Sequence, residues 1–479
     1  MERKIIRENQ LLLPNGEIIT FNDEQKAALK KINEWSFNEK NIFTLGGFAG
    51  TGKTTVIKKF LDEYSGGVVV SAPTHKAKKV IMNKTKKDGL TMQSLLGLRP
   101  DINLDDFNPN DPQFNPIAPP KINDYNLVVI DEASMINEDL YQKILKLINQ
   151  KKTKILFMGD PAQIPPIGEK ESVVFKNNEK EIFWLTKIER QSKDNPLTEI
   201  YSTLRENLEK EDVGFKRTTK LNDKGEGVIF TVNKREFRKL LFEKLSSDEY
   251  KNDSDYCKLI GWKNDTVNKS NEIIRKKLFE NSDEMVLVGD VLMAYRTVTT
   301  MLKRGRFKTI IENSVDYRVI SRSKLIKNKH NIFGYDVTLR ETISKNKYKF
   351  INAFIIDTND YENLHNYAKI HDFLKETAKQ NKKLWSDYYS FRKDNILMKT
   401  IDKQYKSGYR KADQIIVKDM DYGYSITSHK SQGSTYNHVF IMENDINDNW
   451  VTKERNQIKY VSFTRPTTSA VVLTTKLDF

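Results

Sequence analysis

Cysteine and histidine are scarce in this sequence. Its 479 residues include one cysteine, Cys257, and six scattered histidines. A single thiol excludes a disulfide framework, and without clustered cysteines or histidines no four-ligand zinc site is expected. No apolar run approaches the length needed to cross a bilayer, and Met1–Lys4 leads into a polar stretch rather than a secretory signal. We therefore expect a reduced, cytoplasmic protein that does not associate with membranes.

Proline is also uncommon, and its distribution is uneven. Six of the 13 prolines lie within Arg99–Pro120. Because proline removes a backbone donor and blocks helix interiors, this segment is not expected to be helical. We predict an extended, protruding insert there.

Acidic residues are outnumbered by basic ones. The chain has 80 Lys and Arg against 65 Asp and Glu, a formal net charge of +15. A 38% hydrophobic content and a 10% aromatic content argue for folded domains, and the length suggests more than one core. The charge favours a polyanionic partner such as nucleic acid, although a basic protein with no such specialisation fits the charge alone.

Gly47–Thr54 fits the phosphate-binding pattern G-x-x-x-x-G-K-[ST] at every fixed position. The apolar run Ile42–Leu45 before it predicts a buried strand, and Thr54–Tyr64 after it has helical spacing. A strand, a glycine loop and a helix N-terminus together form an anion cradle. We expect this loop to bind a nucleoside triphosphate, with Lys53 against the β- and γ-phosphates.

Further short apolar runs alternate with helical patterns over the first 185 residues. The expected strands are Ile42–Leu45, Val68–Ala72, Leu127–Ile130 and Ile155–Met158. The expected helices are Asp23–Glu34, Thr54–Tyr64, His75–Met82 and Glu138–Asn149. Continuous apolar strands of this kind predict a parallel sheet covered on both faces, with ligands at the carboxyl ends of the strands.

Two carboxylates follow one of these strands. Leu127–Ile130 leads into Asp131 and Glu132. Asp131 is the candidate Mg²⁺ ligand together with the Thr54 hydroxyl, and Glu132 is the candidate general base for an attacking water. After the next strand, the amide of Gln163 is a candidate sensor of the γ-phosphate.

Taken in order, these segments resemble the motifs of superfamily 1 helicases, in the 5′-to-3′ branch of RecD-like and Dda-like enzymes. The matching segments are Phe21–Gln25, Gly47–Thr54, Ala72–Ala77, Thr91–Ser94, Asp131–Met135, Gly159–Ile164, Leu185–Arg190, Ser425–Ser434 and Tyr460–Arg465. Phe463 stands where this family often has a small residue. The likeness implies an ATP-dependent DNA helicase with ATP and Mg as cofactors.

The resemblance implies an α/β fold with two RecA-like parallel-sheet motor domains. Motor one would be residues 1–185, with a strand-separating hairpin at 95–121, and motor two would be residues 186–290 and 413–479. Residues 291–412 would form an inserted SH3-like domain with a helical extension, where Asp360–Lys383 has the pattern of a polar helix and Phe350, Phe354 and Ile356 show partial strand alternation.

The resemblance also assigns roles to individual residues. Catalytic roles would fall to Lys53, Asp131, Glu132, Gln163 and the arginine fingers Arg190 and Arg465. Nucleotide contacts would come from Gln25, which would read adenine, and from Gly47, Gly50, Thr51, Gly52, Lys53, Thr54, Thr55 and Gly433. Nucleic-acid contacts would come from Pro73, Thr74, His75, Lys76, Thr91, Thr427, His429, Lys430 and Ser431, with Phe107 and Phe114 at the hairpin tip or in its base.

The expected partners are single-stranded and forked duplex DNA, with RNA not excluded because the contacts are mostly to phosphate. The resemblance alone implies a monomer that works in DNA replication or repair, with replication or recombination proteins as further partners. It also implies a phage source, with action in the host cytoplasm. Two other functions stay open. One is a DNA-stimulated ATPase that translocates without net unwinding, and the other is a nucleotide-gated single-strand-binding protein with little turnover.

Overall fold

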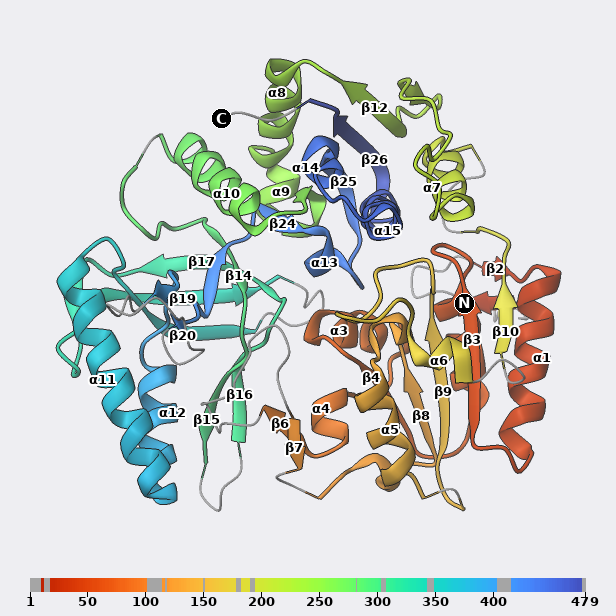
Figure 1. Cartoon of the computed structure of the whole chain (residues 1–479), viewed down its shortest axis with the longest axis horizontal. Coiled ribbons are helices and arrows are strands. Elements are labelled where there is room, and N and C mark those ends of the chain that lie inside the picture. The colour runs from red at the N-terminus through yellow and green to blue at the C-terminus, as the bar shows by residue number, and fades with distance from the viewer. Residues whose placement is uncertain are drawn as a thin grey trace, which may run out of the picture.

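A computed structural model describes residues 10–12, 18–100, 114–116, 119–149, 151–177, 182–189, 194–280, 282–302, 307–342, 349–402 and 415–475. Within these residues the chain forms three lobes, each built on one main sheet (Figure 1). The first and second lobes have mainly parallel sheets, and the third has an antiparallel sheet. The fold is therefore α/β with two parallel-sheet units, as the sequence predicts. No helix among the described residues is long and apolar enough to cross a membrane.

The first lobe contains a six-stranded parallel sheet. Its strands, in spatial order, are β10 (Ile182–Leu185), β3 (Ile42–Gly47), β9 (Lys154–Gly159), β8 (Leu127–Ile130), β4 (Val68–Ala72) and β5 (Gly89–Thr91). Its helices are α1 (Asp23–Phe37), α2 (Lys53–Glu63), α3 (His75–Thr85), α4 (Met92–Leu95), α5 (Glu138–Leu147) and α6 (Val173–Asn177). Short strands β1 (Gln10–Leu12) and β2 (Ile18–Thr20) pair at the edge.

Both faces of this sheet are buried, which explains the continuous apolar runs. Leu127 and Val129 pack with α1, α2 and α3, whereas Val128 and Ile130 pack with α4, α5 and α6. Strand side chains alternate between faces, so a strand covered on both sides must be apolar at every position. Strands β4 and β8 have the bounds expected from the sequence.

The expected hairpin insert begins as an antiparallel pair. Strand β6 (Leu98–Pro100) pairs with β7 (Phe114–Pro116), and Leu98 lies opposite Pro116. This pairing agrees with the prediction that the proline-rich segment is extended rather than helical. Phe107 lies outside the described residues, and the same holds for the side chain of Phe114.

The second lobe repeats the parallel arrangement with one antiparallel edge strand. Its strands, in spatial order, are β11 (Lys220–Leu221), β12 (Gly227–Thr231), β26 (Pro466–Leu473), β25 (Tyr436–Met442), β13 (Cys257–Gly261) and β24 (Ser425–Thr427). Its helices are α7 (Leu197–Glu206), α8 (Lys234–Leu245), α9 (Asp248–Asn252), α10 (Asn264–Leu278), α13 (Ser428–Ser431), α14 (Glu443–Asn447) and α15 (Thr452–Phe463), with the 3₁₀ turn η4 (Ser254–Tyr256). Thus segments more than 150 residues apart in sequence share one sheet.

The third lobe interrupts the second. Its main sheet runs β18 (Ile326–Lys327), β19 (Phe333–Glu341), β17 (Asp316–Arg322), β14 (Val291–Ala294) and β23 (Met420–Tyr422), and β20 (Phe350–Ile356) pairs with β19. A hairpin of β15 (Val298–Met301) and β16 (Phe307–Ile311), the pair β21 (Ile401–Asp402) and β22 (Ile415–Ile416), and the helices α11 (Tyr361–Gln380) and α12 (Trp385–Lys393) complete it.

Three details of this lobe differ from the expectation. Strand β23 pairs with β14, so the sheet continues past residue 412, the expected boundary. The expected helix to Lys383 ends as α11 at Gln380 and is followed by a 3₁₀ turn, because the Asn381 side chain caps that turn. Phe350 is the first residue of β20 but is 56% exposed, whereas Phe354 and Ile356 are buried against α11, so the three side chains do not all face the core.

Candidate nucleotide-binding and nucleic-acid-binding sites

The phosphate loop lies between β3 and α2. Gly50 and Gly52 have φ values of 84° and 86°, a left-handed conformation that favours glycine. No side chain caps the N-terminus of α2, where Gly52 takes the cap position. The first backbone N–H groups of α2 are therefore available to an anion.

Lys53 is folded back onto this loop. Its ammonium donates hydrogen bonds to the carbonyl oxygens of Gly47, at 2.6 Å, and Phe48, at 3.0 Å. Thr51 is fully buried, and its hydroxyl donates to the carbonyl of Phe48 at 2.9 Å. The loop is thus held in shape by its own side chains around the position where phosphates would bind.

Asp131 and Glu132 follow β8 at its carboxyl end. The backbone N–H of Glu132 donates to Asp131 Oδ1 at 2.8 Å. Glu132 has φ 54°, which is unusual for a residue with a side chain and is often found at functional sites. Burial, and then the negative charge of Asp131, raise the pKa of Glu132 to about 7. This carboxylate can therefore exchange a proton near neutral pH.

Magnesium would be held by few protein groups here. Among the described residues no cluster of three or more His, Cys, Asp or Glu side chains could hold a metal ion. Mg²⁺ in nucleotide sites typically takes one or two protein oxygens and completes its shell with phosphates and waters. The half-buried Thr54 and Asp131 beside an uncapped helix N-terminus fit that donor set.

The second lobe reaches the same carboxylate. Positive charges on Arg465, from the second lobe, and Lys53, from the first, both lower the pKa of Glu132. Arg465 is only 3% exposed, and its guanidinium donates to the carbonyl oxygens of Val461 and Ser434 at 3.0 and 3.1 Å. Charges from both lobes therefore act on Glu132, and the position of a nucleotide between Lys53 and Arg465 stays a prediction.

Gly433 closes the site from the same side. It has φ 71°, and a Cβ there would lie 2.8 Å from the Cβ of Ala77 and 3.6 Å from Glu132 Cγ. Glycine is required at this point both by its conformation and by the closeness of the first lobe.

Four contacts across the cleft are made by three residues to which sequence reasoning gave no role: Tyr460, Gln457 and Arg205. The hydroxyl of Tyr460 donates to Asp160 Oδ2 at 2.7 Å and accepts from the backbone N–H of Ala49 at 3.2 Å. Gln457 donates to the carbonyl of Gln163 at 3.1 Å. The Arg205 guanidinium lies 3.9 Å from the centre of the Phe48 ring. Tyr460 opens the matched segment that ends at Arg465, and Gln457 precedes it in the same helix, so this segment is the signal that could have found them.

Gln25 contacts the phosphate loop itself. Its side-chain amide donates to the carbonyl of Thr51 at 3.1 Å, and its side-chain oxygen accepts from the backbone of Asn22. The residue is 3% exposed. Gln163 is similarly buried, at 5%, and its Oε1 has no hydrogen-bond partner among the described residues. The amide of Gln25 thus lies on the phosphate loop, and the roles of Gln25 and Gln163 toward a nucleotide stay predictions.

Three threonines of the expected nucleic-acid surface cap helices at the carboxyl ends of strands. Thr74 caps α3, Thr91 caps α4 and Thr427 caps α13 through hydrogen bonds from backbone N–H groups. Such helix N-termini offer further N–H donors to phosphates. Pro73, Thr55, His429 and Lys430 are half-buried.

The structure corrects the expectation for Lys76. Its side chain is 2% exposed, and its ammonium lies 3.1 Å from Asp255 Oδ1, so it is not available to DNA phosphates. Ser431 is likewise fully buried, and its hydroxyl donates to the carbonyl of Ser428 at 2.7 Å. His75 keeps a half-buried ring, 3.5 Å from Glu312 Oε2. Arg190 lies outside the described residues.

Comparison with known proteins places this geometry in a class. A family model described as an AAA domain matches residues 20–226. An uncharacterized protein of Acanthamoeba polyphaga mimivirus is 29% identical over 92% of this chain and 97% of its own length. The ATP-dependent DNA helicase Dda of Enterobacteria phage T4 is 24% identical over 78% of this chain and 86% of its own length.

Solved structures agree with the fold. The Pif1 helicase from Bacteroides, in complex with ADP-AlF3 and ssDNA, aligns with a TM-score of 0.51 at 17% identity, covering 96% of this chain and 94% of that one. The fold and site thus define a P-loop protein with two RecA-like lobes. The chain is thus similar in sequence to Dda and in fold to Pif1, and these likenesses support the resemblance to superfamily 1 helicases of the RecD-like branch.

Proposed function

We propose that this protein is an ATP-dependent DNA helicase that moves 5′ to 3′ along single-stranded DNA and unwinds duplex DNA. The observation that supports it most is the closeness of the two lobes at Glu132, where a Cβ at Gly433 of the second lobe would lie 3.6 Å from Glu132 Cγ and where the charges of Lys53 and Arg465 both act on the carboxylate. A nucleotide there would contact both lobes, so its hydrolysis can change their separation. The related proteins Dda and Pif1, named as helicases, support the same function.

Within this proposal each residue of the site has a role. Lys53 orients the β- and γ-phosphates, and Thr54 and Asp131 hold Mg²⁺, which would neutralise charge on the phosphates when bound. Glu132 accepts a proton from the attacking water. Arg465, with Arg190, neutralises charge that develops on the transferred phosphoryl group, and Gln163 senses that group.

DNA would be gripped at the strand ends of both parallel sheets. Thr74 and Thr91 present helix N-termini from the first lobe, and Thr427 presents one from the second. Because phosphate contacts do not read bases, sequence-independent binding that weakens with salt is expected. Closing the cleft shortens the distance between the two grips, and the hairpin that begins at β6 and β7 would split the duplex.

We extend the proposal to organisation and setting. The three lobes would correspond to motor one (residues 1–185), motor two (186–290 and 423–479) and an insert (291–422), a division in which β23 belongs to the insert. The protein would act as a monomer in the cytoplasm, or in the host cytoplasm if a phage encodes it.

The test is strand displacement on duplexes with a 5′ tail or a 3′ tail, with and without ATP. The proposal expects ATP-dependent release of a strand from the 5′-tailed duplex only. ATP turnover stimulated by DNA without strand release would favour a translocase that does not unwind. DNA binding that responds to nucleotide without turnover would favour a nucleotide-gated binding protein.

A further inference from the structure

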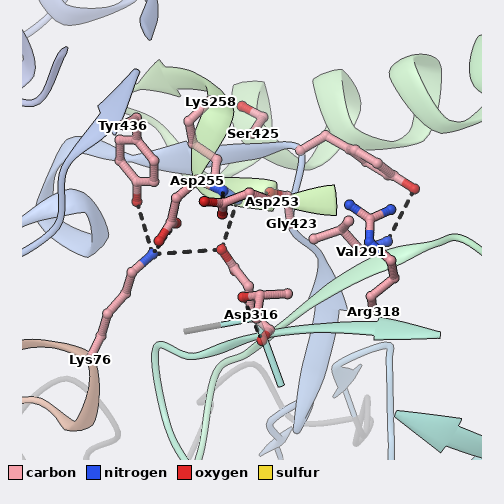
Figure 2. A network of polar contacts seen from close by, with 12 residues as sticks. Lys76, Asp253, Asp255, Lys258, Val291, Asp316, Arg318, Gly423, Ser425 and Tyr436 are labelled. Carbon is pink, nitrogen blue, oxygen red and sulfur yellow. Dashed lines mark hydrogen bonds and ion pairs between the residues drawn. The ribbon is translucent and has the colours of Figure 1, made fainter. Parts of the chain in front are cut away.

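Lys76 is buried where the three lobes meet. It lies on α3 of the first lobe, directly after His75, and its side chain is 2% exposed. Its ammonium lies 3.1 Å from Asp255 Oδ1 and 3.4 Å from the hydroxyl of Tyr436, both in the second lobe (Figure 2). It also lies 3.6 Å from Asp316 Oδ2 on β17 of the third lobe. One side chain therefore contacts all three parts of the molecule.

A second lysine completes the group. Lys258 on β13 lies 2.9 Å from the same Asp316 oxygen and 2.5 Å from the carbonyl of Gly423, and both charged side chains are fully buried. Figure 2 shows Asp316 between the two ammonium groups. Two lysines and two aspartates thus form a group of zero formal net charge, which we call the Lys76–Asp316 quartet (Lys76, Asp255, Lys258 and Asp316). Three of its side chains are buried, and that of Asp255 is 27% exposed.

The charged forms of two members, Lys76 and Asp316, are favoured by their partners, whereas burial raises the pKa of Asp255. Burial alone would lower the pKa of Lys76, but Asp255, with Tyr436 and Asp316, raises it well above its ordinary value. Lys258 and Lys76 likewise lower the pKa of Asp316 despite its burial. Removing one member of a buried ion group leaves an uncompensated charge, which is strongly unfavourable. Lys76 therefore resists leaving its position.

The second lobe and the third lobe are already joined without Lys76. Arg318 on β17 donates to the carbonyl oxygens of Tyr250 and Gly289, and Lys258 pairs with Asp316. Only Lys76 in the quartet comes from the first lobe. Its neighbour Lys79 adds contacts to Glu312 and Glu341 of the third lobe at 2.7 and 2.6 Å. Helix α3 is thus the element that joins the first lobe to the other two lobes at this junction.

We propose that Lys76 is a positioning residue that anchors the first lobe at a pivot and so fixes how far the nucleotide cleft opens. The pivot lies at α3, whose Ala77 also approaches Gly433 at the cleft. If α3 stays in place, rotation of the first lobe about it changes the separation of Lys53 and Arg465. The lobes then keep their contact at the pivot. Only its consequence for ATP use rests on the proposed function, because the anchoring itself is a property of the fold.

The variants are chosen by the net charge that each one leaves in the quartet. Lys76→Met leaves a net charge of −1 in the buried group and removes the anchor. Asp255→Asn leaves +1 and keeps Lys76. The double variant restores zero charge with Lys258 and Asp316 alone, yet it still lacks the anchor. Lys58→Met is the matched control, because it removes the same charge elsewhere in the first lobe, where Lys58 pairs with Asp62 on α2 at 2.7 Å.

The distance between the lobes can be measured independently of the stability of each variant. Spin labels at Glu39→Cys and Asp223→Cys would report the separation of the first and second lobes by pulsed electron resonance, since both positions are exposed. The native Cys257 is fully buried, so it would not take up label. We expect one narrow distance distribution in the parent protein and in Lys58→Met, and a broad one in Lys76→Met and in the double variant.

Thermal unfolding and ATP use separate anchoring from charge balance. We expect the double variant to regain the melting temperature that Lys76→Met loses, while using at least threefold more ATP per base pair unwound than the parent. A narrow distribution in the double variant, or recovery of both stability and ATP economy, would overturn the proposal. So would failure of both variants to fold. If the parent itself hydrolyses no ATP, the proposed function fails, and the spin-label distances still decide the role of Lys76.

Discussion

The hydroxyl of Tyr460 lies 2.7 Å from a carboxylate oxygen of Asp160, although the two residues come from different sheets and are separated by 300 positions in sequence. The same hydroxyl accepts a hydrogen bond from the backbone of Ala49 in the phosphate loop. Burial and the nearby Asp160 raise the pKa of Tyr460 well above its ordinary value, so it stays a donor. One side chain of the second lobe thus links the phosphate loop to the strand end beside it.

Replacing Tyr460 with Phe should weaken this link without changing the packing of the ring. Asp160 is fully buried, so loss of the donor leaves one of its oxygens without a partner. A hydrogen bond to a charged group contributes about 2 kcal/mol, and we expect the free energy of unfolding to fall by that amount. Denaturant titration measures this, with Tyr256→Phe as the control because its hydroxyl lies 3.4 Å from Lys244 in a more exposed position. Equal losses in the two variants would contradict the prediction.

Local patterns in the sequence predicted much of the two parallel sheets. Val68–Ala72 and Leu127–Ile130 are apolar at nearly every position, and both became strands with those bounds. Burial on both faces leaves a continuous signal in a strand, whereas the third lobe offers only partial alternation. Strand β23 returns to β14 after more than 120 residues, and no local pattern specifies such a pairing.

The sequence pointed to residues of the site that lie in motifs. It did not point to contacts with partners that are distant in the sequence. Glu132 follows a strand end as expected, and the positive charges of Lys53 and Arg465 both act on it, while the roles of the three residues stay predictions. Lys76 was wrongly expected to bind nucleic acid. Its partner Asp255 lies 179 positions away, and only the folded chain shows that a lysine in a DNA-binding motif is buried in an ion group. Tyr460 was missed for the same reason.

Substitution of Gly433 by Ala should lower ATP turnover more strongly than it lowers the free energy of unfolding. The added methyl group would lie 2.8 Å from Ala77 across the cleft and would force the lobes apart. Gly225→Ala is a matched control, since Gly225 has φ 74° and nothing within 4 Å of such a methyl group. Both variants should lose about 1 kcal/mol of stability from the left-handed conformation. Only Gly433→Ala should also lose about tenfold in ATP turnover, equivalent to about 1.4 kcal/mol in the barrier. Equal turnover in both would show that the contact is unimportant.

Lys53→Ala should abolish ATP hydrolysis and spare DNA binding. The ammonium is the cation nearest the expected β- and γ-phosphates, and removal of one such group typically lowers turnover by about 100-fold or more. Lys59→Ala is the control, because it removes a lysine from the same helix, α2, where Lys59 pairs with Glu63. Steady-state hydrolysis and fluorescence anisotropy with labelled single-stranded DNA measure the two properties. Normal hydrolysis by Lys53→Ala would mean that the phosphate site has been wrongly assigned.

Binding of single-stranded DNA should weaken above pH 8 through Lys430. Burial, and then the positive charge of Lys418, lower the pKa of Lys430 to about 8, and its ammonium lies 4.2 Å from the centre of the Tyr295 ring. A phosphate contact requires the protonated form, so as pH rises through 8 binding must be accompanied by proton uptake, and affinity should fall by up to about tenfold per pH unit. Lys430→Arg stays charged and should bind with little change between pH 7 and 9, while Lys430→Met should bind weakly at both. Anisotropy titrations at constant salt measure this, and a parent profile as flat as that of Lys430→Arg would exclude Lys430 from the phosphate contacts.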